Sequence, residues 1–241
     1  MTVTNDLPTV AILAGGLATR LRPATTSMPK ALLELAGEPF IAHQLRLLES
    51  AGIHRVVLCV GHLGNSIQAF VGDGRRFGLR VEYSFDGPRL LGTAGALRQA
   101  SGLLGDHFFV LYGDSYLPCD YRAINDAFSA AGKPALMTVY RNENAYDRSN
   151  VELVNGTILR YNVKAASARM RHIDYGLGVL SSSVLSLVPP GEACGLSDLY
   201  RSLVQKGLVA AYEVQERFYE IGSWRGLEEL RGLMARGLIG A

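Results

Sequence analysis

The stretch Val10–Lys30, with the sequence VAILAGGLATRLRPATTSMPK, decides how the rest of the chain can be organised. It opens with Val10–Leu13, an apolar run that is long enough for a buried strand and too short for a helix. Small residues follow at Ala14–Gly16, where the backbone can turn sharply and approach a ligand closely. A glycine-rich turn after a strand presents backbone N–H groups to phosphate oxygens. The stretch therefore predicts a strand that ends in a phosphate-binding loop.

Two cations lie further along the same stretch, at Arg20 and Lys30. They can approach one anion from two sides, as a nucleoside triphosphate site requires. Gly15 and Gly16 alone are also compatible with an ordinary tight turn, and the stretch contains neither GxGxxG nor GxxxxGK[ST]. The prediction of a nucleotide site therefore depends on the whole string rather than on the glycines.

The composition of the 241 residues is that of a globular chain, with 48% hydrophobic and 19% charged residues. This length can bury a large core as one α/β domain. The net charge is only +2, with both signs dispersed, so no nucleic-acid partner is expected. The composition favours an enzyme or a small-molecule-binding protein over a nucleic-acid-binding one.

The cysteines and the N-terminal residues indicate a cytoplasmic protein. Three scattered cysteines, at Cys59, Cys119 and Cys194, lack metal-ligand spacing and are expected to be reduced. The first residues, MTVTNDLPTV, lack the basic and apolar segments of a secretory signal. No apolar run approaches the length that spans a bilayer, so no membrane partner is expected.

Apolar strands and amphipathic helices alternate along the first half of the chain. Strands are expected at 55–60, 80–85, 108–112, 135–140 and 209–214, and a short extended segment at 31–35. Helices are expected at 39–50, 120–131, 197–205 and 224–234, within 90–100, and after Asn65, which can cap one. Asn155–Gly156 predicts a hairpin between 150–154 and 157–161. The order indicates an α/β fold with a mixed, mainly parallel sheet and helices on both faces.

Two further stretches contain residues that could bind a ligand, one directly after a predicted strand and one at the start of a predicted helix. Asp114 directly follows the strand at 108–112, and open α/β sheets bind ligands at such carboxyl ends of strands. Asp114 could equally cap the next turn. The glycines of Leu91–Ala96 (LGTAGA) could allow the backbone at Gly92–Ala94 to lie against a flat base, or could simply start a helix.

The whole of Gly15–Lys30 resembles the G-G-x-G-T-R-L-x-P…P-K signature of the sugar-1-phosphate nucleotidyltransferases. Motifs at Leu91–Ala96, Gly113–Ser115 and Tyr219–Ser223 resemble further family elements in the same order. The resemblance implies a Rossmann-like single domain over 1–241, with a nucleotide-binding half (about 1–132) and a sugar-binding half (about 133–241). No hexapeptide repeat is present, so no β-helix domain is expected.

The reaction implied by the resemblance joins an NTP and a sugar 1-phosphate into an NDP-sugar and releases pyrophosphate. The catalytic residues carried over are Arg20, Lys30 and Asp114, and Mg²⁺ is expected on Asp114 and Glu220. Glu220 stands where the family has Asp. Ala18 stands where the family has glycine, so that either a positive φ is not needed there or the loop is placed differently.

The same resemblance implies two sets of binding residues. The nucleotide is expected to contact Leu13, Ala14, Gly15, Gly16, Thr19, Asp86, Gly92 and Thr93. The sugar is expected to contact Asn150, Lys164, Asp174 and Gly176. Competing explanations remain for two of these residues, because Lys164 could be a solvated surface lysine and Asp174 a turn residue before Gly176.

Fewer residues bear on which nucleobase and which sugar the protein would bind. Leu91–Gly95 looks more like the corresponding stretch of mannose- and heptose-1-phosphate guanylyltransferases than that of thymidylyl- or uridylyltransferases, and Asp86 could accept hydrogen bonds from guanine N1–H and N2–H₂. Together these features favour GTP with a manno-type heptose or hexose 1-phosphate. A uridylyl- or thymidylyltransferase acting on another sugar 1-phosphate, such as N-acetylmuramate 1-phosphate, is the alternative enzyme. A catalytically silent sensor domain for nucleotide sugars is the alternative from a different class. The sequence leaves a homo-oligomer open.

Overall fold

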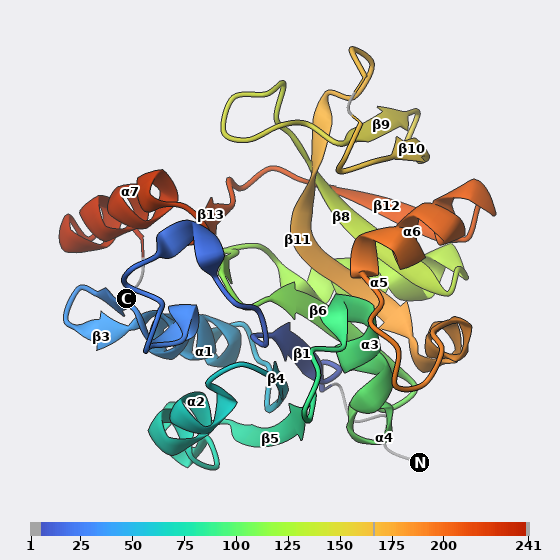
Figure 1. The fold of residues 1–241 in the computed structure, drawn as a ribbon. Helices are drawn as coiled ribbons and strands as arrows, with labels where there is room; N and C mark the ends of the chain where they lie inside the picture. The colour runs from blue at the N-terminus through green and yellow to red at the C-terminus, as the bar shows by residue number, and fades with distance from the viewer. Residues whose placement is uncertain (1–5, 166, 240–241) are drawn as a thin grey trace.

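A nine-stranded sheet forms the centre of the protein, whose structure is a computed structural model that describes residues 6–165 and 167–239. Helices cover both faces of this sheet (Figure 1). Its parallel part consists of β6 (His107–Tyr112), β1 (Val10–Leu13), β4 (Arg55–Val60) and β5 (Arg80–Phe85), in that order. The predicted α/β fold with a mixed, mainly parallel sheet is therefore confirmed, as is the strand that precedes the glycine loop.

The second half of the chain extends the same sheet with antiparallel pairs. β11 (His172–Ser181) pairs antiparallel with β6, β8 (Ala135–Arg141) pairs antiparallel with β11, and β12 (Val209–Val214) lies parallel to β8. β9 (Val151–Val154) and β10 (Thr157–Tyr161) form the predicted hairpin, with φ of 49° at Asn155 and 74° at Gly156. β11 was not predicted as a strand, because two glycines weaken the pattern of strand-forming residues within it.

Side chains alternate along the strands and thereby fill two separate cores. Val10 and Ile12 lie in one core and Ala11 in the other, as the period of two in a strand requires. The first core also contains residues of α1 (Phe40–Ser50), α2 (Gly64–Val71) and α5 (Tyr121–Ala131). The second contains residues of α3 (Gly92–Gln99), α4 (Ser101–Leu104) and α6 (Leu196–Gln205). Helices on both faces of the sheet are thus a consequence of this alternation.

A third, smaller core holds α7 (Trp224–Ala235) against the N-terminal loops. Leu227 and Leu230 of α7 are buried there together with Leu21, Phe40 and Ile221. The strand β13 (Tyr219–Glu220), just before α7, pairs antiparallel with β7 (Ser115–Tyr116) and sets Glu220 opposite Ser115. A residue near the C-terminus of the chain is thereby placed beside the end of β6.

Short elements correct two predictions about the N-terminal half. The segment 31–35 is not extended throughout, because Lys30–Leu32 forms the 3₁₀ turn η2 before the short hairpin of β2 (Glu34–Leu35) and β3 (Glu38–Pro39). The prediction that Asn65 caps a helix is wrong, since α2 already begins at Gly64 after Leu63 in the left-handed conformation. The remaining 3₁₀ turns are η1 (Thr19–Leu21), η3 (Arg75–Phe77) and η4 (Ser182–Leu187).

Within 6–165 and 167–239, no helix combines the length and the apolar character that crossing a bilayer requires.

Candidate active site

The glycine loop after β1 lines a small cavity together with two of the three predicted catalytic residues. This cavity of about 70 Å³ lies at the carboxyl ends of β1 and β6. Backbone hydrogen bonds hold the loop in place, from Ala14 N to Cys59 O (2.8 Å) and from Gly113 N to Leu13 O (3.0 Å). The lining includes Lys30 and Asp114 together with Leu13, Ala14, Gly16 and Ala18.

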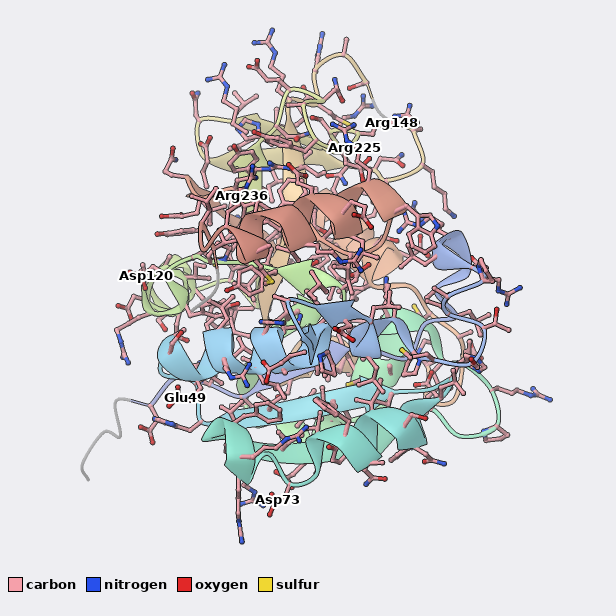
Figure 2. All side chains as sticks on the ribbon, turned by 90° about the vertical axis from the view of Figure 1, so that its left-hand side faces the viewer. Glu49, Asp73, Asp120, Arg148, Arg225 and Arg236 are labelled. Atoms are coloured by element: carbon pink, nitrogen blue, oxygen red, sulfur yellow. The ribbon has the colours of Figure 1, made fainter. Side chains whose placement is uncertain are left out.

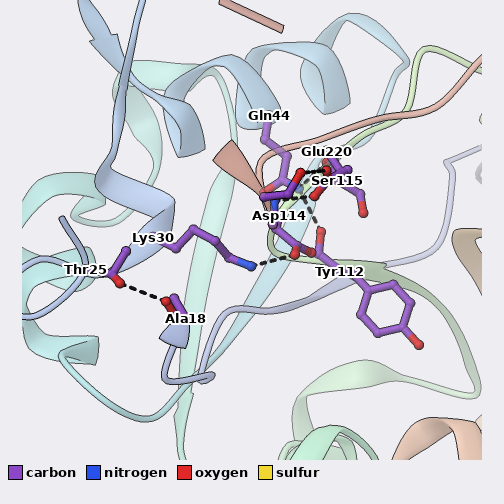
Figure 3. A network of polar contacts seen from close by, with 10 residues as sticks. Ala18, Thr25, Lys30, Gln44, Tyr112, Asp114, Ser115 and Glu220 are labelled. Carbon is purple, nitrogen blue, oxygen red and sulfur yellow. Dashed lines mark hydrogen bonds and ion pairs between the residues drawn. The ribbon is translucent and has the colours of Figure 1, made fainter. Parts of the chain in front are cut away.

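Ala18 keeps the backbone conformation for which the family uses glycine. Its φ of 48° and ψ of 40° are left-handed, which costs an L-residue with a Cβ free energy. The hydroxyl of Thr25 donates a hydrogen bond of 2.8 Å to the carbonyl oxygen of Ala18 (Figure 3). The expectation that no positive φ is needed at Ala18 is therefore wrong.

Lys30 and Asp114 form an ion pair at the mouth of this loop. Lys30 Nζ lies 2.5 Å from Asp114 Oδ2, and both side chains are about one-fifth exposed, at 21% and 23% (Figure 3). A charge-assisted hydrogen bond of this kind fixes both groups before a ligand arrives. The ammonium group is therefore already directed at the place where a phosphate would approach Asp114.

The turn that carries Asp114 is braced from α1 by Gln44. The side-chain Nε2 of Gln44, which is buried, donates hydrogen bonds to Tyr112 O (3.1 Å) and Ser115 O (2.8 Å) on either side of Asp114 (Figure 3). Gln44 was not identified from the sequence as part of the site. The only signal was a polar residue on the apolar face of a predicted helix, which does not reveal its partners.

Glu220 joins this group from the other end of the chain. Its carboxylate accepts hydrogen bonds from Gly222 N and, at 2.6 Å, from Ser223 Oγ. A Cβ on Gly222 would lie 2.6 Å from Glu220 Oε2, 2.9 Å from Asp114 Oδ2 and 3.0 Å from Arg20 Nη2. Glycine at 222 therefore leaves open the space in which these three charged groups converge.

The donor set around Gly222 fits a hard divalent cation. Mg²⁺ prefers oxygen ligands and is commonly held by one or two carboxylates together with substrate phosphates. Asp114 and Glu220 supply two carboxylates, and Gly222 keeps the space between them free of a side chain. Among the residues that the structure describes, no group of three or more His, Cys, Asp or Glu could hold a metal ion, so phosphate and water would complete the coordination.

A larger cavity opens on the other side of Asp114, with a volume of about 510 Å³. Asp114 lines both cavities, whereas Arg20 and Glu220 line the larger one. The remaining wall comes from β11, the loop before β9, and the segment from Arg217 into α7. The two cavities therefore meet at the acidic residue that follows β6.

Asp174 lies in the wall of this larger cavity, and its carboxylate accepts two hydrogen bonds from within the protein. Tyr161 Oη donates to its Oδ2 at 3.0 Å, and Gly176 N donates to its Oδ1 at 3.1 Å. Asn150 Oδ1 accepts a hydrogen bond of 2.8 Å from Asp174 N. Burial raises the pKa of Asp174 to about 6. The structure thus gathers Asn150, Asp174 and Gly176 around one cavity, as a shared sugar site requires.

Lys164 lies apart from the other predicted sugar-binding residues. It is exposed on the turn after β10, where its backbone N–H donates to Asn162 Oδ1 at 2.9 Å. The neighbouring Val163 contributes to the larger cavity, whereas Lys164 does not. The structure therefore brings three of the four predicted sugar-binding residues together.

Asp86 lies beside the glycine loop, at the end of β5. Its Oδ2 accepts a hydrogen bond of 3.2 Å from Leu91 N, and burial raises its pKa. A Cβ on Gly61 would lie 3.0 Å from Asp86 Oδ2 and 2.8 Å from Leu90 Cδ2. Leu90, an apolar side chain that is 38% exposed next to this carboxylate, was not identified from the sequence.

The predicted nucleotide residues Gly92 and Thr93 make contacts within the protein. A Cβ on Gly92 would lie 2.6 Å from Cys194 O, and Gly92 has a φ of 69°. Thr93 Oγ1 accepts a hydrogen bond of 2.7 Å from Leu196 N at the start of α6. The helix α6 begins at Leu196, one residue before the start that the sequence predicts. Glycine at 92 therefore makes room for the backbone at Cys194, a reason that the sequence did not suggest.

Thr19, another predicted nucleotide residue, is exposed at the first position of η1.

Arg217 is the centre of a second set of side-chain contacts in the larger cavity, which the sequence did not indicate. Its Nη1 and Nη2 donate to the two carboxylate oxygens of Glu229, each at 2.7 Å. Its Cζ lies 3.6 Å from the ring centre of Tyr146 and 5.1 Å from that of Tyr219. Arg217 therefore links the loop before β9, the approach to β13 and α7 around the larger cavity.

Comparison with known proteins gives relatives over nearly the whole chain. The chain is 29% identical over 247 residues to "UTP--glucose-1-phosphate uridylyltransferase" of Synechocystis sp., covering 93% of the chain and 63% of the relative. It is 30% identical over 217 residues to "Mannose-1-phosphate guanylyltransferase catalytic subunit beta" of Xenopus tropicalis, covering 88% and 60%. The chain thus spans about three-fifths of the length of these two relatives.

A solved structure shares the fold at lower identity. A Bacillus anthracis protein assigned as a glucose-1-phosphate thymidylyltransferase superposes with a TM-score of 0.82 at 23% identity, over 93% of this chain and 94% of that one. Residues 9–230 match the family described as "Nucleotidyl transferase". The chain therefore belongs to the nucleotidyl transferase family, whose members among its relatives are sugar-1-phosphate nucleotidyltransferases.

Proposed function

We propose that the protein transfers a nucleotidyl group from an NTP to a sugar 1-phosphate and releases pyrophosphate. The observation that carries this proposal is the convergence of Arg20, Asp114 and Glu220 around Gly222, where a loop cavity and a larger cavity meet. The glycine loop suits the triphosphate, and the larger cavity has the polar lining and the volume that suit a sugar. The meeting point is where the two substrates would react.

The reaction requires two polyanions to approach each other in line. A phosphate oxygen of the sugar 1-phosphate forms a bond to the α-phosphorus, and the bond between that phosphorus and the bridging oxygen breaks as pyrophosphate leaves. Because the attacking phosphate is already ionised at pH 7, no general base is needed. Catalysis then consists mainly of positioning and of neutralising charge.

The residues around Gly222 divide this work between them. Arg20 binds the triphosphate and stabilises the departing pyrophosphate. Lys30, held 2.5 Å from Asp114, keeps the sugar phosphate or the α-phosphate in line. Asp114 and Glu220 would hold Mg²⁺, which, when bound, supplies a Lewis acid that draws negative charge from the phosphate oxygens. Asn150 and Asp174 orient the sugar through its hydroxyl groups.

We propose GTP and a manno-type heptose or hexose 1-phosphate as the substrates. The carboxylate of Asp86 beside the glycine loop supports guanine, because it can accept from N1–H and N2–H₂. The Xenopus relative, named a mannose-1-phosphate guanylyltransferase, supports the same pair of substrates. A uridylyl- or thymidylyltransferase acting on another sugar 1-phosphate, such as N-acetylmuramate 1-phosphate, is the second candidate, favoured by the nearly equal identity of the Synechocystis relative.

The test is a pyrophosphate-release assay with Mg²⁺ that crosses ATP, GTP, CTP, UTP and dTTP with a panel of hexose, heptose and N-acetylmuramate 1-phosphates. Release that is greatest with GTP and a manno-type sugar is the expected result. Preference for UTP or dTTP would retain the reaction and reject the role of Asp86. Nucleotide binding without release from any pair would contradict the enzyme and support a sensor domain.

A further inference from the structure

The larger cavity has to receive the dianionic phosphate of a sugar 1-phosphate, yet the predicted cation Lys164 does not line it. Three arginines line it instead: Arg20, Arg217 and Arg225. Each of them carries a fixed positive charge at any physiological pH. The neighbours of each arginine decide which of them remains able to bind a phosphate group.

Both Nη atoms of Arg217 are committed within the protein, whereas its Nε has no hydrogen-bond partner among the described residues. Both of its Nη atoms donate to Glu229, and Tyr146 covers one face of the guanidinium at 3.6 Å. Its Nε is buried. A bidentate, stacked arginine of this kind keeps its geometry only while these contacts persist. Arg217 is therefore a support for the cavity wall and not a free cation.

The two cations of the glycine loop, Arg20 and Lys30, lie where the two cavities meet. Arg20 Nη2 lies beside Asp114 and Glu220, at the place proposed for the triphosphate. Lys30 is held by Asp114 at 2.5 Å. Of the three arginines that line the larger cavity, Arg225 is the one that lies on α7.

Unlike Arg217, Arg225 is not held in an ion pair by any residue that the structure describes. Its side chain is exposed, and within the described ranges 6–165 and 167–239 it forms no ion pair. Glu229, four residues later on α7, would ordinarily be its i,i+4 partner, but that carboxylate is bound by Arg217. Glu229 therefore still attracts Arg225 electrostatically, but both of its carboxylate oxygens accept hydrogen bonds from Arg217.

The position of Arg225 on α7 places it next to the reacting groups. A Cβ on the adjacent residue, Gly226, would lie 2.1 Å from Glu220 Oε1, so the first turn of α7 abuts the Glu220 carboxylate. Figure 2 shows Arg225 above α7, toward the part of the chain that carries Arg148, whereas Arg236 lies toward the other end of the helix. Arg225 thus lies in the lining of the larger cavity, one residue before the helix position that abuts Glu220.

We propose that Arg225, in place of Lys164, binds the phosphate group of the incoming sugar 1-phosphate. This inference rests on the proposed function, since it names a further substrate-binding residue of the same site. A guanidinium suits the task because its fork of N–H donors matches two phosphate oxygens at once. Loss of such charge-assisted hydrogen bonds predicts an affinity for the sugar 1-phosphate that is about 10- to 100-fold weaker.

The experiment compares Arg225→Gln and Arg225→Lys with Arg236→Gln, an exposed arginine at the end of the same helix, and with Lys164→Gln. Calorimetry measures the binding of mannose 1-phosphate, glucose 1-phosphate, N-acetylmuramate 1-phosphate and inorganic phosphate, and kinetics measure KM for each substrate. Arg225→Gln is expected to weaken phosphate-ester binding and to raise KM for the sugar 1-phosphate, without changing KM for the NTP or the melting temperature. Arg225→Lys should restore part of the loss, and Arg236→Gln should bind as the wild type does.

Several results would overturn the proposal. Arg225→Gln with wild-type binding, a larger loss in Lys164→Gln than in Arg225→Gln, or a wild type that binds neither the sugar phosphates nor inorganic phosphate would each do so. Absence of pyrophosphate release from the wild type would reject the proposed function alone, because the binding measurements test Arg225 without turnover.

Discussion

The proposed nucleotide side and the proposed sugar side of this site are built in different ways. On the nucleotide side, the strand, the glycine loop, Arg20 and Lys30 all come from one stretch, Val10–Lys30. On the sugar side, Tyr146, Asp174 and Arg217 come from distant segments and meet only through the sheet and α7. A contiguous site can be recognised in a sequence, whereas a dispersed one depends on how the elements pack. Variants on the two sides should therefore fail in different ways.

The largest effect is expected at the junction of the two sides. Asp114→Ala should lower kcat by about 10³-fold or more, because it removes a carboxylate and the partner of Lys30 where charge develops. Steady-state pyrophosphate release checks this, and circular dichroism confirms the fold. Asp126→Ala, which alters an exposed aspartate on α5, is the matched control. Wild-type turnover in Asp114→Ala would remove Asp114 from the reaction centre.

A smaller effect, on KM for the sugar 1-phosphate rather than for the NTP, is expected from Arg217→Lys. Lysine keeps the charge but loses the bidentate pairing with Glu229 and the stacking on Tyr146. We expect KM for the sugar 1-phosphate to rise about tenfold, while KM for the NTP changes little, at a cost of about 1–2 kcal/mol in the free energy of unfolding.

Arg201→Lys is the control for Arg217→Lys, since Arg201 makes a single contact with Asp198 on the surface of α6. An equal rise in both KM values in Arg217→Lys would show that the two sides of the site are not independent.

The raised pKa of Asp174, on the proposed sugar side, predicts that the free energy of unfolding depends on pH. Its pKa is raised from 3.8 to about 6, so between these values the folded chain binds more protons than the unfolded chain. The contribution of Asp174 to stability is therefore greatest below pH 4 and is lost as the pH rises through 6. Denaturant unfolding from pH 4 to 7 should show a fall of up to about 3 kcal/mol in the wild type relative to Asp174→Asn. Parallel pH profiles of the two proteins would contradict this.

The smallest effect is expected on the nucleotide side, at Ala18. Ala18→Gly relieves the cost of a Cβ at φ 48° but adds backbone entropy to the unfolded chain. The two terms oppose each other, so we expect the free energy of unfolding to change by less than about 1 kcal/mol, with unchanged KM values. Urea unfolding measures the change. A loss of activity would show that alanine at 18 positions the loop in a way glycine does not.

The accuracy of the sequence predictions follows the same division. The strand Val10–Leu13 and the hairpin at Asn155–Gly156 were predicted correctly, since their signals are local: an apolar run and a turn dipeptide. Lys164 was carried over from a motif in which both neighbours differ, and the turn after β10 leaves it outside the cavity. Gln44 and Arg217 gave no local signal, because their partners are far away in the sequence.

The sequence by itself determined the fold class, and it predicted the phosphate loop and most of the charged groups that the structure brings together around Gly222. It could do so because strand length, glycine placement and side-chain charge act within a few residues. Only the tertiary structure decided that Glu220 reaches Asp114 through the pairing of β13 with β7. It likewise decided that the carboxylate of Glu229 pairs with Arg217, while Arg225 is in no ion pair among the described residues. Such choices among several carboxylates and arginines are made by packing, since any of them could pair equally well by charge alone.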